Sequence, residues 1–500
     1  MPQAGGNRPW LDGVTTWGAN GTMNGTSDAQ LETLVAEIAP PGMNVFAHVR
    51  REVGSLIAER IEGRIDSVQG LTVTAVGLPV PVGARCRIAT RREGDVEAEV
   101  VGLAGERAVL SILGEATGLA PDDPVTCVSG VPRVPVGLDL LGRVIDARGN
   151  PIDGRVAPVL NVRQPLYADA PAPLDRLPID RPLGLGIRAI DGLLTAGRGQ
   201  RLGIFAGTGV GKSVLMGMIC RHTQASVNVI ALVGERGREV RDFIENNLGP
   251  EGLRRSVVIA CTSDEAPALR VRACFHATAI AEFFRDQGHD VLLMVDSITR
   301  LAMAQRQIGL AAGEPPTAKG YPPSTFALLP RLLERAGRTR RGSITGIYTV
   351  LVEGDDIDEP LADAVRGILD GHIWLSRRLA NRGHYPAIDV LNSISRVAPD
   401  VTDAAQQQAA LRVRRVLATW DDIEDLVSIG AYVAGANVEY DVAVQTRETV
   451  TDFLRQDRSA GHTFEQTARD LRALGELIEK TGAKAASAKP APGGQPAASS

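Results

Sequence analysis

The middle of the chain, residues 184–400, alternates continuous apolar runs with longer segments of mixed character, such as Ala268–Gln287. Runs without polar interruption are typical of strands covered on both faces, and the longer segments have the length of helices. This alternation predicts a mostly parallel sheet with helices on both faces, joined by right-handed crossovers. The predicted strands are Leu202–Phe205, Val227–Val233, Val257–Cys261, Val291–Val295, Ile344–Val352 and His372–Leu375.

Different patterns flank this block. Residues 59–113 alternate apolar and polar positions with period two between glycines, which predicts a small antiparallel β-barrel or sandwich. A proline-rich connecting segment, 114–183, follows, and Val136–Gly154 within it resembles a strand, a turn and a second strand. Residues 401–482 have helical spacing and predict a separate helical domain, in which one face carries Val413, Val416, Leu417 and Trp420, and a capping box of Thr463 and Gln466 precedes Leu471, Leu474 and Ile478.

The two ends of the chain differ from the rest. Residues 1–26 are polar and 483–500 are rich in Ala, Pro, Gly and Ser, so both are expected to be disordered tails. Between the first tail and the barrel lies an amphipathic segment, 27–58, in which Ser27–Ala39 predicts a short helix. That helix either packs on the next domain or binds a partner.

Composition narrows the class of protein. Hydrophobic residues at 44% and charged residues at 23% are ordinary for a soluble globular chain. A net charge of −5 and only 4% aromatic residues argue against nucleic-acid binding. The sequence has no run long enough to span a membrane and no signal-like start, so a cytosolic protein is expected. The five cysteines form no CxxC pair and are expected to be buried, reduced thiols.

A glycine-rich loop follows the first predicted strand of the central block and leads into an apolar helix. Its glycines let successive backbone N–H groups face an anion, and the helix N-terminus adds free N–H groups. Lys212 supplies charge for the β- and γ-phosphates, and Ser213 supplies a hydroxyl for Mg²⁺. Ala206 stands where the P-loop pattern has its first glycine. The predicted nucleotide-binding residues of the loop are Gly207, Thr208, Gly209, Val210, Gly211, Lys212, Ser213 and Val214.

Two further strand ends carry carboxylates. Asp296 ends an apolar run, as does the Walker B aspartate that holds Mg²⁺. Glu235, after the strand that follows the P-loop helix, is the candidate to polarise the attacking water, and Arg236 is a candidate phosphate contact. The alternatives are an aspartate that only caps a helix and a solvated charge cluster at a helix start.

Two residues after the last predicted strand complete the candidate site. Tyr385 could stack on adenine, and Arg396 could act as an arginine finger. Taken from spacing alone, they could also be a buried tyrosine and a surface arginine.

Taken together, these motifs resemble the ATPase of flagellar type III protein export, which is similar to the injectisome export ATPases and to the catalytic β subunit of the rotary F- and V-type ATPases. The resemblance spans about residues 27–455 and is densest in GRGQRLGIFAGTGVGKS, GERGRE, DVLLMVDSITRLAMAQRQIG, GEPPTAKGYPPS, TVLVEGDDIDEPLADAVRGILDGHI and HYPAIDVLNSISR. It implies an α/β RecA-like P-loop ATPase core with a small N-terminal β-barrel and a C-terminal α-helical domain, in a homohexamer with ATP and Mg²⁺ between subunits.

The resemblance also implies roles for single residues. Lys212, Ser213 and Asp296 match the phosphate and Mg²⁺ ligands, and Glu235 matches the catalytic glutamate, with Arg236 beside it. Tyr385 matches the adenine-stacking tyrosine, and Arg396 matches the finger that reaches the neighbouring subunit's nucleotide. Gly313–Pro323 resembles the loop that lines the hexamer pore, and the family commonly has alanine at the position of Ala206.

Partners and place in the cell follow from the same resemblance. Residues 27–58 would bind a regulatory stalk subunit, and the C-terminal domain would meet a central stalk protein and export chaperone–substrate complexes. Delivery of unfolded cargo to a membrane export gate implies a cytoplasmic protein held peripherally at the inner membrane. Three other classes compete: a rotary synthase β subunit, a hexameric helicase such as a transcription terminator, and a non-catalytic nucleotide-binding subunit. The acidic C-terminal loop signature of the synthase is not evident, the acidic balance argues against the helicase, and Glu235 argues against a non-catalytic subunit.

Overall fold

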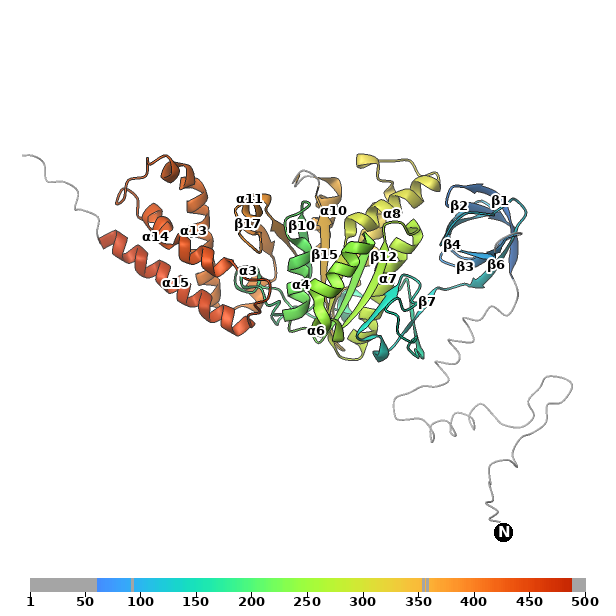
Figure 1. Ribbon diagram of the computed structural model, residues 1–500, viewed down its shortest axis with the longest axis horizontal. Coiled ribbons are helices and arrows are strands. Elements are labelled where there is room, and N and C mark those ends of the chain that lie inside the picture. The colour runs from blue at the N-terminus through green and yellow to red at the C-terminus, as the bar shows by residue number, and fades with distance from the viewer. Residues whose placement is uncertain (1–60, 91–93, 353–355, 357–358, 488–500) are drawn as a thin grey trace, which may run out of the picture. The chain divides into compact units, whose positions relative to one another are not determined.

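The computed structural model describes residues 61–90, 94–352, 356 and 359–487. Its first strands form a closed barrel in the order β1-β2-β5-β4-β3-β6 (Figure 1). Residues that alternate along these strands, such as Val73 and Ala75 on β2, are fully buried inside it, as the period-two pattern predicts. The strands are β1 (Glu62–Gln69), β2 (Thr72–Val76), β3 (Arg85–Ala89), β4 (Asp95–Ala104), β5 (Arg107–Ile112) and β6 (Pro124–Ser129).

The barrel extends beyond its predicted range of 59–113. Strand β6 lies in the segment predicted to be a connection, and it pairs with both β1 and β3 to close the barrel. Proline is tolerated at the first position of a strand, where Pro124 stands, so the proline-rich composition of 114–183 concealed a strand there.

The remainder of that connecting segment is also more ordered than its composition indicates. Strands β7 (Arg133–Val136) and β9 (Val162–Pro165) form a two-stranded sheet. Between them β8 (Arg143–Asp146), preceded by the 3₁₀ turn η1 (Leu138–Leu140), pairs in parallel with β12 of the central sheet. The central sheet therefore begins upstream of the predicted boundary at 184. Within Val136–Gly154, the predicted first strand and turn are confirmed.

The central sheet has nine strands in the described part of the chain, with the main order β17-β16-β10-β15-β13-β11-β12-β8 and β14 paired to β15. It is parallel apart from β17 and β14, as the alternating pattern predicts. All six predicted strands are present, but β14 and β17 were not predicted. The strands are β10 (Arg201–Ala206), β11 (Val227–Glu235), β12 (Ser256–Thr262), β13 (Asp290–Asp296), β14 (Gly337–Arg338), β15 (Ser343–Leu351), β16 (Gly371–Leu375) and β17 (Ile388–Ser395).

Both faces of the sheet are covered. Along β11, Val229 and Ala231 belong to one hydrophobic cluster, whereas Ile230 and Leu232 belong to another. Alternate side chains of one strand thus enter two cores, which explains the continuous apolar runs. The helices and turns of this region are η2 (Pro173–Asp175), α3 (Arg188–Leu193), α4 (Lys212–His222), α5 (Gly237–Asp242), the π-helical turn η3 (Phe243–Leu248), α6 (Gly249–Arg254), α7 (Pro267–Asp286), α8 (Ile298–Ala311), η4 (Ala318–Gly320), α9 (Pro323–Leu333), α10 (Pro360–Ile368), α11 (Arg377–Asn381) and α12 (Ala398–Val401).

The chain then forms the helices α13 (Ala404–Ser428), α14 (Val438–Leu454) and α15 (Phe464–Ser487), which pack on one another and on α3 (Figure 1). Gly475 allows α15 to approach α13 closely, because a β-carbon at this position would lie 2.8 Å from that of Ala409. The predicted capping box is confirmed: the backbone N–H of Gln466 donates to Thr463, 3.2 Å, and that of Thr463 donates to the side chain of Gln466, 3.1 Å. Helix α15 continues to Ser487, so the predicted start of the tail at residue 483 is wrong by at least five residues.

Three of the segments predicted from the sequence cannot be compared with the structure. The tail 1–26, the segment 27–58 and residues 488–500 lie outside the described residues.

The five cysteines are free and buried, as predicted. None of the helices within the described ranges combines the length and the apolar character that a membrane-spanning segment requires.

Acid is expected to destabilise this fold through His276 on α7. The imidazole is fully buried, and its Nδ1 lies 3.3 Å from the carbonyl oxygen of Ala147. Burial, and then the charge of Arg272, lower its pKa to about 4. In the unfolded chain the pKa of histidine is about 6.5, so as the pH falls the unfolded state takes up the proton before the folded state does. The free energy of unfolding therefore falls by about 3 kcal/mol as the pH drops from the higher of these two pKa values to the lower.

Urea denaturation between pH 7 and pH ~4.5 measures this effect. The variant His276→Gln has no proton to bind, so its unfolding free energy should fall less steeply with pH than that of the wild type, whatever its stability at pH 7. Equal slopes for the two proteins would contradict the assignment.

Candidate nucleotide-binding site

The loop between β10 and α4 has the geometry of a phosphate cradle. Gly209 and Gly211 adopt positive φ angles of 79° and 92°, which turn the backbone inward and favour glycine at both positions. Helix α4 begins at Lys212, and no side chain caps its N-terminus, so its first N–H groups remain available to an anion. Ala206 is the fully buried last residue of β10, where a methyl group packs in the core, which explains why alanine fits this position.

Three predicted site residues meet beside this loop. Lys212 Nζ forms an ion pair with Asp296 Oδ1 and lies 4.0 Å from Glu235 Oε1. Asp296 ends β13 and Glu235 ends β11, the neighbouring parallel strand, so both carboxylates stand at the same edge of the sheet. Thr349 of β15 donates a hydrogen bond of 2.6 Å to the same oxygen of Asp296 and fixes this carboxylate.

The environment of Glu235 is suited to proton chemistry. Burial, and then the charge of Asp296, raise its pKa to about 7, while Lys212 opposes the shift. A hydrogen bond with Glu239 on α5 also favours the protonated form of Glu235. A carboxyl whose pKa lies near neutrality can both accept and release a proton at physiological pH, as a general base requires.

Arg236 does not join this group of residues. It stands at the N-cap position of α5 without a capping hydrogen bond from its side chain, which is 82% exposed, and its Nη1 lies 3.9 Å from Glu239 Oε1. Among the described residues its ion pair is with Glu239, and not with Glu235 or Asp296.

Tyr385 borders a cavity of about 340 Å³ next to the loop. A β-carbon on Gly211 would lie 3.6 Å from two of its ring carbons, so the ring stands beside the phosphate cradle with 47% of its surface exposed. The cavity has the apolar walls and size expected for a base. It is lined by Val210, Gly211, Val214, Leu215, Met218, Leu375, Tyr385, Pro386, Ala387, Gln456, Asp457 and Arg458.

Arg396 lies apart from these groups. It follows β17, its side chain is exposed, and it forms no ion pair with any residue in the described ranges. Its backbone N–H is fixed by the carbonyl oxygen of Asp370, 3.0 Å away. The side chain is thus presented on a surface rather than directed into the site of its own chain.

Sequence reasoning missed three contributions. Thr349 holds Asp296, and residues 456–458 line the base cavity from beyond α14. On the phosphate side, Arg300 and Lys319 line a second cavity of about 400 Å³ together with Thr208 of the loop. Lys319 lies in the predicted pore loop, 3.6 Å from Asp356. Of these residues, only Arg300 could have been predicted from the local sequence. It lies four residues after Asp296, on the first turn of the helix that follows the Walker B strand.

The donors around Asp296 fit Mg²⁺. No group of three or more His, Cys, Asp or Glu side chains within the described ranges could hold a metal ion by itself. Mg²⁺ typically takes one or two protein oxygens and completes its shell with substrate phosphates and water. The hydroxyl of Ser213, exposed on the first turn of α4, and the carboxylate of Asp296 supply such oxygens beside the phosphate cradle.

Comparisons with known proteins agree with this geometry. Residues 186–395 match the nucleotide-binding domain of the ATP synthase alpha/beta family, and residues 402–473 match the T3SS EscN ATPase C-terminal domain. The chain is 50% identical over 414 residues to the flagellum-specific ATP synthase of Bacillus subtilis (strain 168), covering 82% of this chain and 94% of that protein. It is 49% identical over 428 residues to the type 3 secretion system ATPase of Xanthomonas euvesicatoria, covering 85% and 97%.

A solved structure extends the match to the fold. The assembled ATPase EscN from the enteropathogenic E. coli type III secretion system aligns with a TM-score of 0.78 and 43% identity, covering 83% of this chain and 100% of that one. The predicted fold, a RecA-like core with an N-terminal barrel and a C-terminal helical domain, is confirmed. With such identity across almost the whole length of these relatives, the chain belongs to the ATP synthase α/β family, in its group of flagellum-specific and type III secretion ATPases, and hydrolyses ATP.

Proposed function

We propose that this ATPase is the motor of a flagellar type III export apparatus, which releases cargo from chaperones, unfolds it and delivers it to a membrane gate. The observation that carries the proposal is the meeting of Lys212, Glu235 and Asp296 beside an uncapped helix N-terminus. It occurs in a chain that is half identical to flagellum-specific relatives. Coupling hydrolysis to transport makes the enzyme a translocase.

Each residue of the site has a proposed task. Lys212 and the N–H groups of the loop bind and orient the β- and γ-phosphates. Ser213 and Asp296 hold Mg²⁺, which when bound supplies positive charge to the phosphate oxygens. Glu235 orients and deprotonates the attacking water, and Tyr385 stacks on adenine in the cavity beside it. Arg236, exposed next to Glu235, turns toward the phosphates when they are present.

The assembly proposed is a ring in which a neighbour completes each site. Arg396, exposed and without an ion pair among the described residues, serves as the finger for the adjacent subunit's nucleotide. The relative EscN has been solved as an assembled ATPase and in complex with its central stalk EscO. By analogy we assign this chain a homohexamer, a stalk partner at its helical domain and a pore loop at Gly313–Pro323.

Other partners rest on the family alone. Residues 27–58 are proposed to bind a regulatory stalk subunit, and the helical domain is proposed to receive chaperone–substrate complexes. These contacts would hold the ATPase peripherally at the cytoplasmic face of the inner membrane, next to the export gate.

Deleting the gene in its source organism tests this assignment. The deletion should abolish swimming in soft agar and remove hook and filament proteins from the culture medium, and the wild-type gene should restore both. Restoration by Glu235→Gln would show that hydrolysis at this site is not needed.

An injectisome ATPase is the second candidate, favoured by the 49% identity to the Xanthomonas enzyme. It predicts normal swimming and loss of secreted effector proteins in the same deletion strain. Normal swimming together with normal effector secretion would overturn both assignments.

A further inference from the structure

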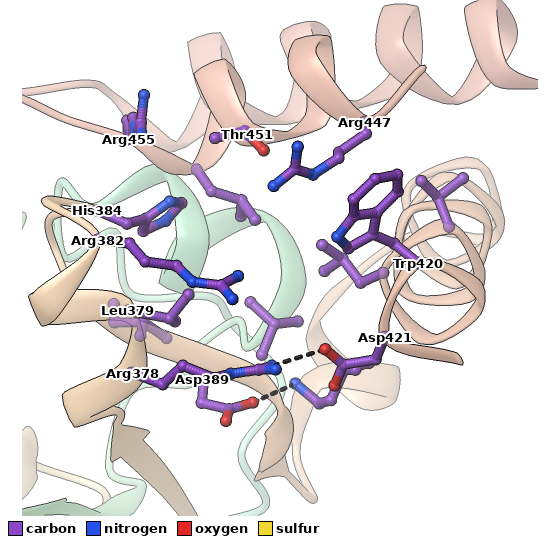
Figure 2. Close-up of a pocket in the computed structure, with 16 residues that line it drawn as sticks. Arg378, Leu379, Arg382, His384, Asp389, Trp420, Asp421, Arg447, Thr451 and Arg455 are labelled. Atoms are coloured by element: carbon purple, nitrogen blue, oxygen red, sulfur yellow. Dashed lines mark hydrogen bonds and ion pairs between the residues drawn. The ribbon is translucent and has the colours of Figure 1, made fainter. Parts of the chain in front are cut away.

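A third pocket is lined by residues next to those of the base cavity and lies between the nucleotide-binding core and the C-terminal helices. Its volume is about 340 Å³, within the range of small-molecule sites. Helix α11 and the start of β17 form one side, and α13 and α14 form the other (Figure 2). We call it the interdomain pocket; the residues that matter for its chemistry are Arg378, Leu379, Arg382, Leu417, Trp420 and Arg447.

Guanidinium groups dominate the polar part of this pocket. Figure 2 shows those of Arg382 and Arg447 directed into the space from opposite sides. Arg382 forms a two-pronged pair with Glu424, at 2.7 and 3.2 Å. Arg378 pairs with Asp421 at 2.6 Å.

Arg447 has the weakest pairing of these cations. Its contact with Glu424 is 3.9 Å long, and Glu424 is already engaged by Arg382. Its guanidinium carbon lies 4.0 Å above the centre of the Trp420 ring, which holds the group in place by a cation–π contact. The guanidinium of Arg447 is therefore held in place and has N–H groups available to hydrogen-bond a ligand.

The positive charge in the pocket exceeds the negative charge. Arg455 adds a fourth guanidinium. Burial of His384, and then the charge of Arg455, lower the pKa of His384. The lining has two carboxylates, Asp421 and Asp389, and Asp389 accepts hydrogen bonds from the backbone N–H groups of Leu391 and Asn392. A site with this surplus of donors favours an anion.

The rest of the lining is apolar. Leu379, Ile388 and Leu454 are among the aliphatic side chains of the pocket wall, and Trp420 contributes an aromatic edge. Apolar walls with a few fixed cations suit a molecule that has an apolar body and one acidic group.

The interdomain pocket shares two segments with the base cavity. His384 and Leu454 face the pocket, while Tyr385 and Gln456 face the base cavity. The backbone N–H of Gln456 donates to the carbonyl oxygen of Tyr385, 2.9 Å away, and ties these segments together. A ligand that pushes these two segments apart would move Tyr385 relative to the phosphate-binding loop.

We propose that the interdomain pocket binds a small amphipathic anion, with an apolar ring or chain and one sulfonate, phosphate or carboxylate group, and that occupancy changes nucleotide affinity. The second half rests on the proposed base site at Tyr385. Linkage requires that nucleotide change the anion's affinity by the same factor.

Anilinonaphthalene sulfonate is a suitable probe, because it joins an aromatic body to one acidic group. On the full-length protein it should bind with quenching of Trp420 fluorescence, and the quenching should vanish in Trp420→Phe. Arg447→Gln should raise the dissociation constant about tenfold, the size of a lost hydrogen bond to a charged group, and Arg447→Lys should recover part of it. Arg469→Gln, an exposed arginine on α15, is the matched control and should change nothing.

Two results would overturn the anion site. One is equal binding of the uncharged analogue phenylnaphthylamine, and the other is equal affinity of the probe for the wild type and Arg447→Gln. Thr451→Tyr, which fills the pocket from α14, gives an independent check, since it should abolish binding while the protein keeps its helical circular dichroism.

The link to nucleotide is tested by titrating the probe with and without saturating ADP. The affinity of the probe should shift several-fold without complete displacement. An unchanged affinity in a protein that binds ADP would overturn the link, whereas complete displacement would show that the probe occupies the nucleotide site. Failure of the wild type to bind ADP at all would instead contradict the proposed nucleotide site.

Discussion

Glu235→Gln should keep ATP bound but slow its hydrolysis at least about 10²-fold, the usual contribution of a positioned general base. Glutamine has the size of glutamate, so the phosphate loop and the Lys212–Asp296 pair stay in place. It lacks the carboxylate that accepts the water's proton. Equilibrium binding of labelled ATP and single-turnover hydrolysis measure the two effects separately.

Glu239→Gln is the matched control for this experiment. Glu239 bonds to Glu235, but its side chain is 49% exposed and lies one helical turn away. Turnover should fall by less than about tenfold, because only the support of the base is changed. If both variants hydrolyse ATP at the wild-type rate, the base lies elsewhere; if Glu239→Gln is the slower one, the roles are reversed.

The sequence was most informative where the chain is apolar on both sides. The runs at β10, β11 and β13 were predictable because a strand buried on two faces has no polar interruption. Strand β17 escaped notice because it lies at an edge of the sheet, with buried and exposed positions intermixed. Strand β8 was predicted as a strand but not as part of the central sheet, because it is only four residues long and lies among prolines and glycines, far upstream of the alternating block.

In the site, too, features encoded by local sequence were predictable, and features that depend on long-range packing were not. That Lys212, Glu235 and Asp296 lie together was predictable, because each stands at the end of an apolar strand or just after one, and the ends of parallel strands meet at one edge. Thr349 could not be predicted, because its bond to Asp296 joins residues 53 positions apart. The wall contributed by Gln456, Asp457 and Arg458 depends on how the helical domain packs, which no local pattern encodes.

Arg396→Ala should reduce turnover about 10³-fold or more, the usual effect of removing an arginine finger, and leave nucleotide affinity nearly unchanged. The exposed side chain makes no ion pair within the described part of its own chain, so its loss should not disturb the fold. Steady-state hydrolysis and size-exclusion chromatography measure activity and assembly. Arg415→Ala, another exposed arginine without an ion pair among the described residues, is the control and should keep wild-type turnover.

Mixing subunits decides whether the finger acts between chains. Lys212→Ala removes the phosphate charge but keeps Arg396, whereas Arg396→Ala keeps the phosphate loop. In an equal mixture about one interface in four joins an intact loop to an intact finger, since each ring contact is head to tail. Such a mixture of two nearly inactive proteins should therefore recover a clear part of wild-type turnover. If both variants assemble and exchange subunits yet the mixture stays inactive, Arg396 works within its own chain or only supports the fold, and the site is not shared.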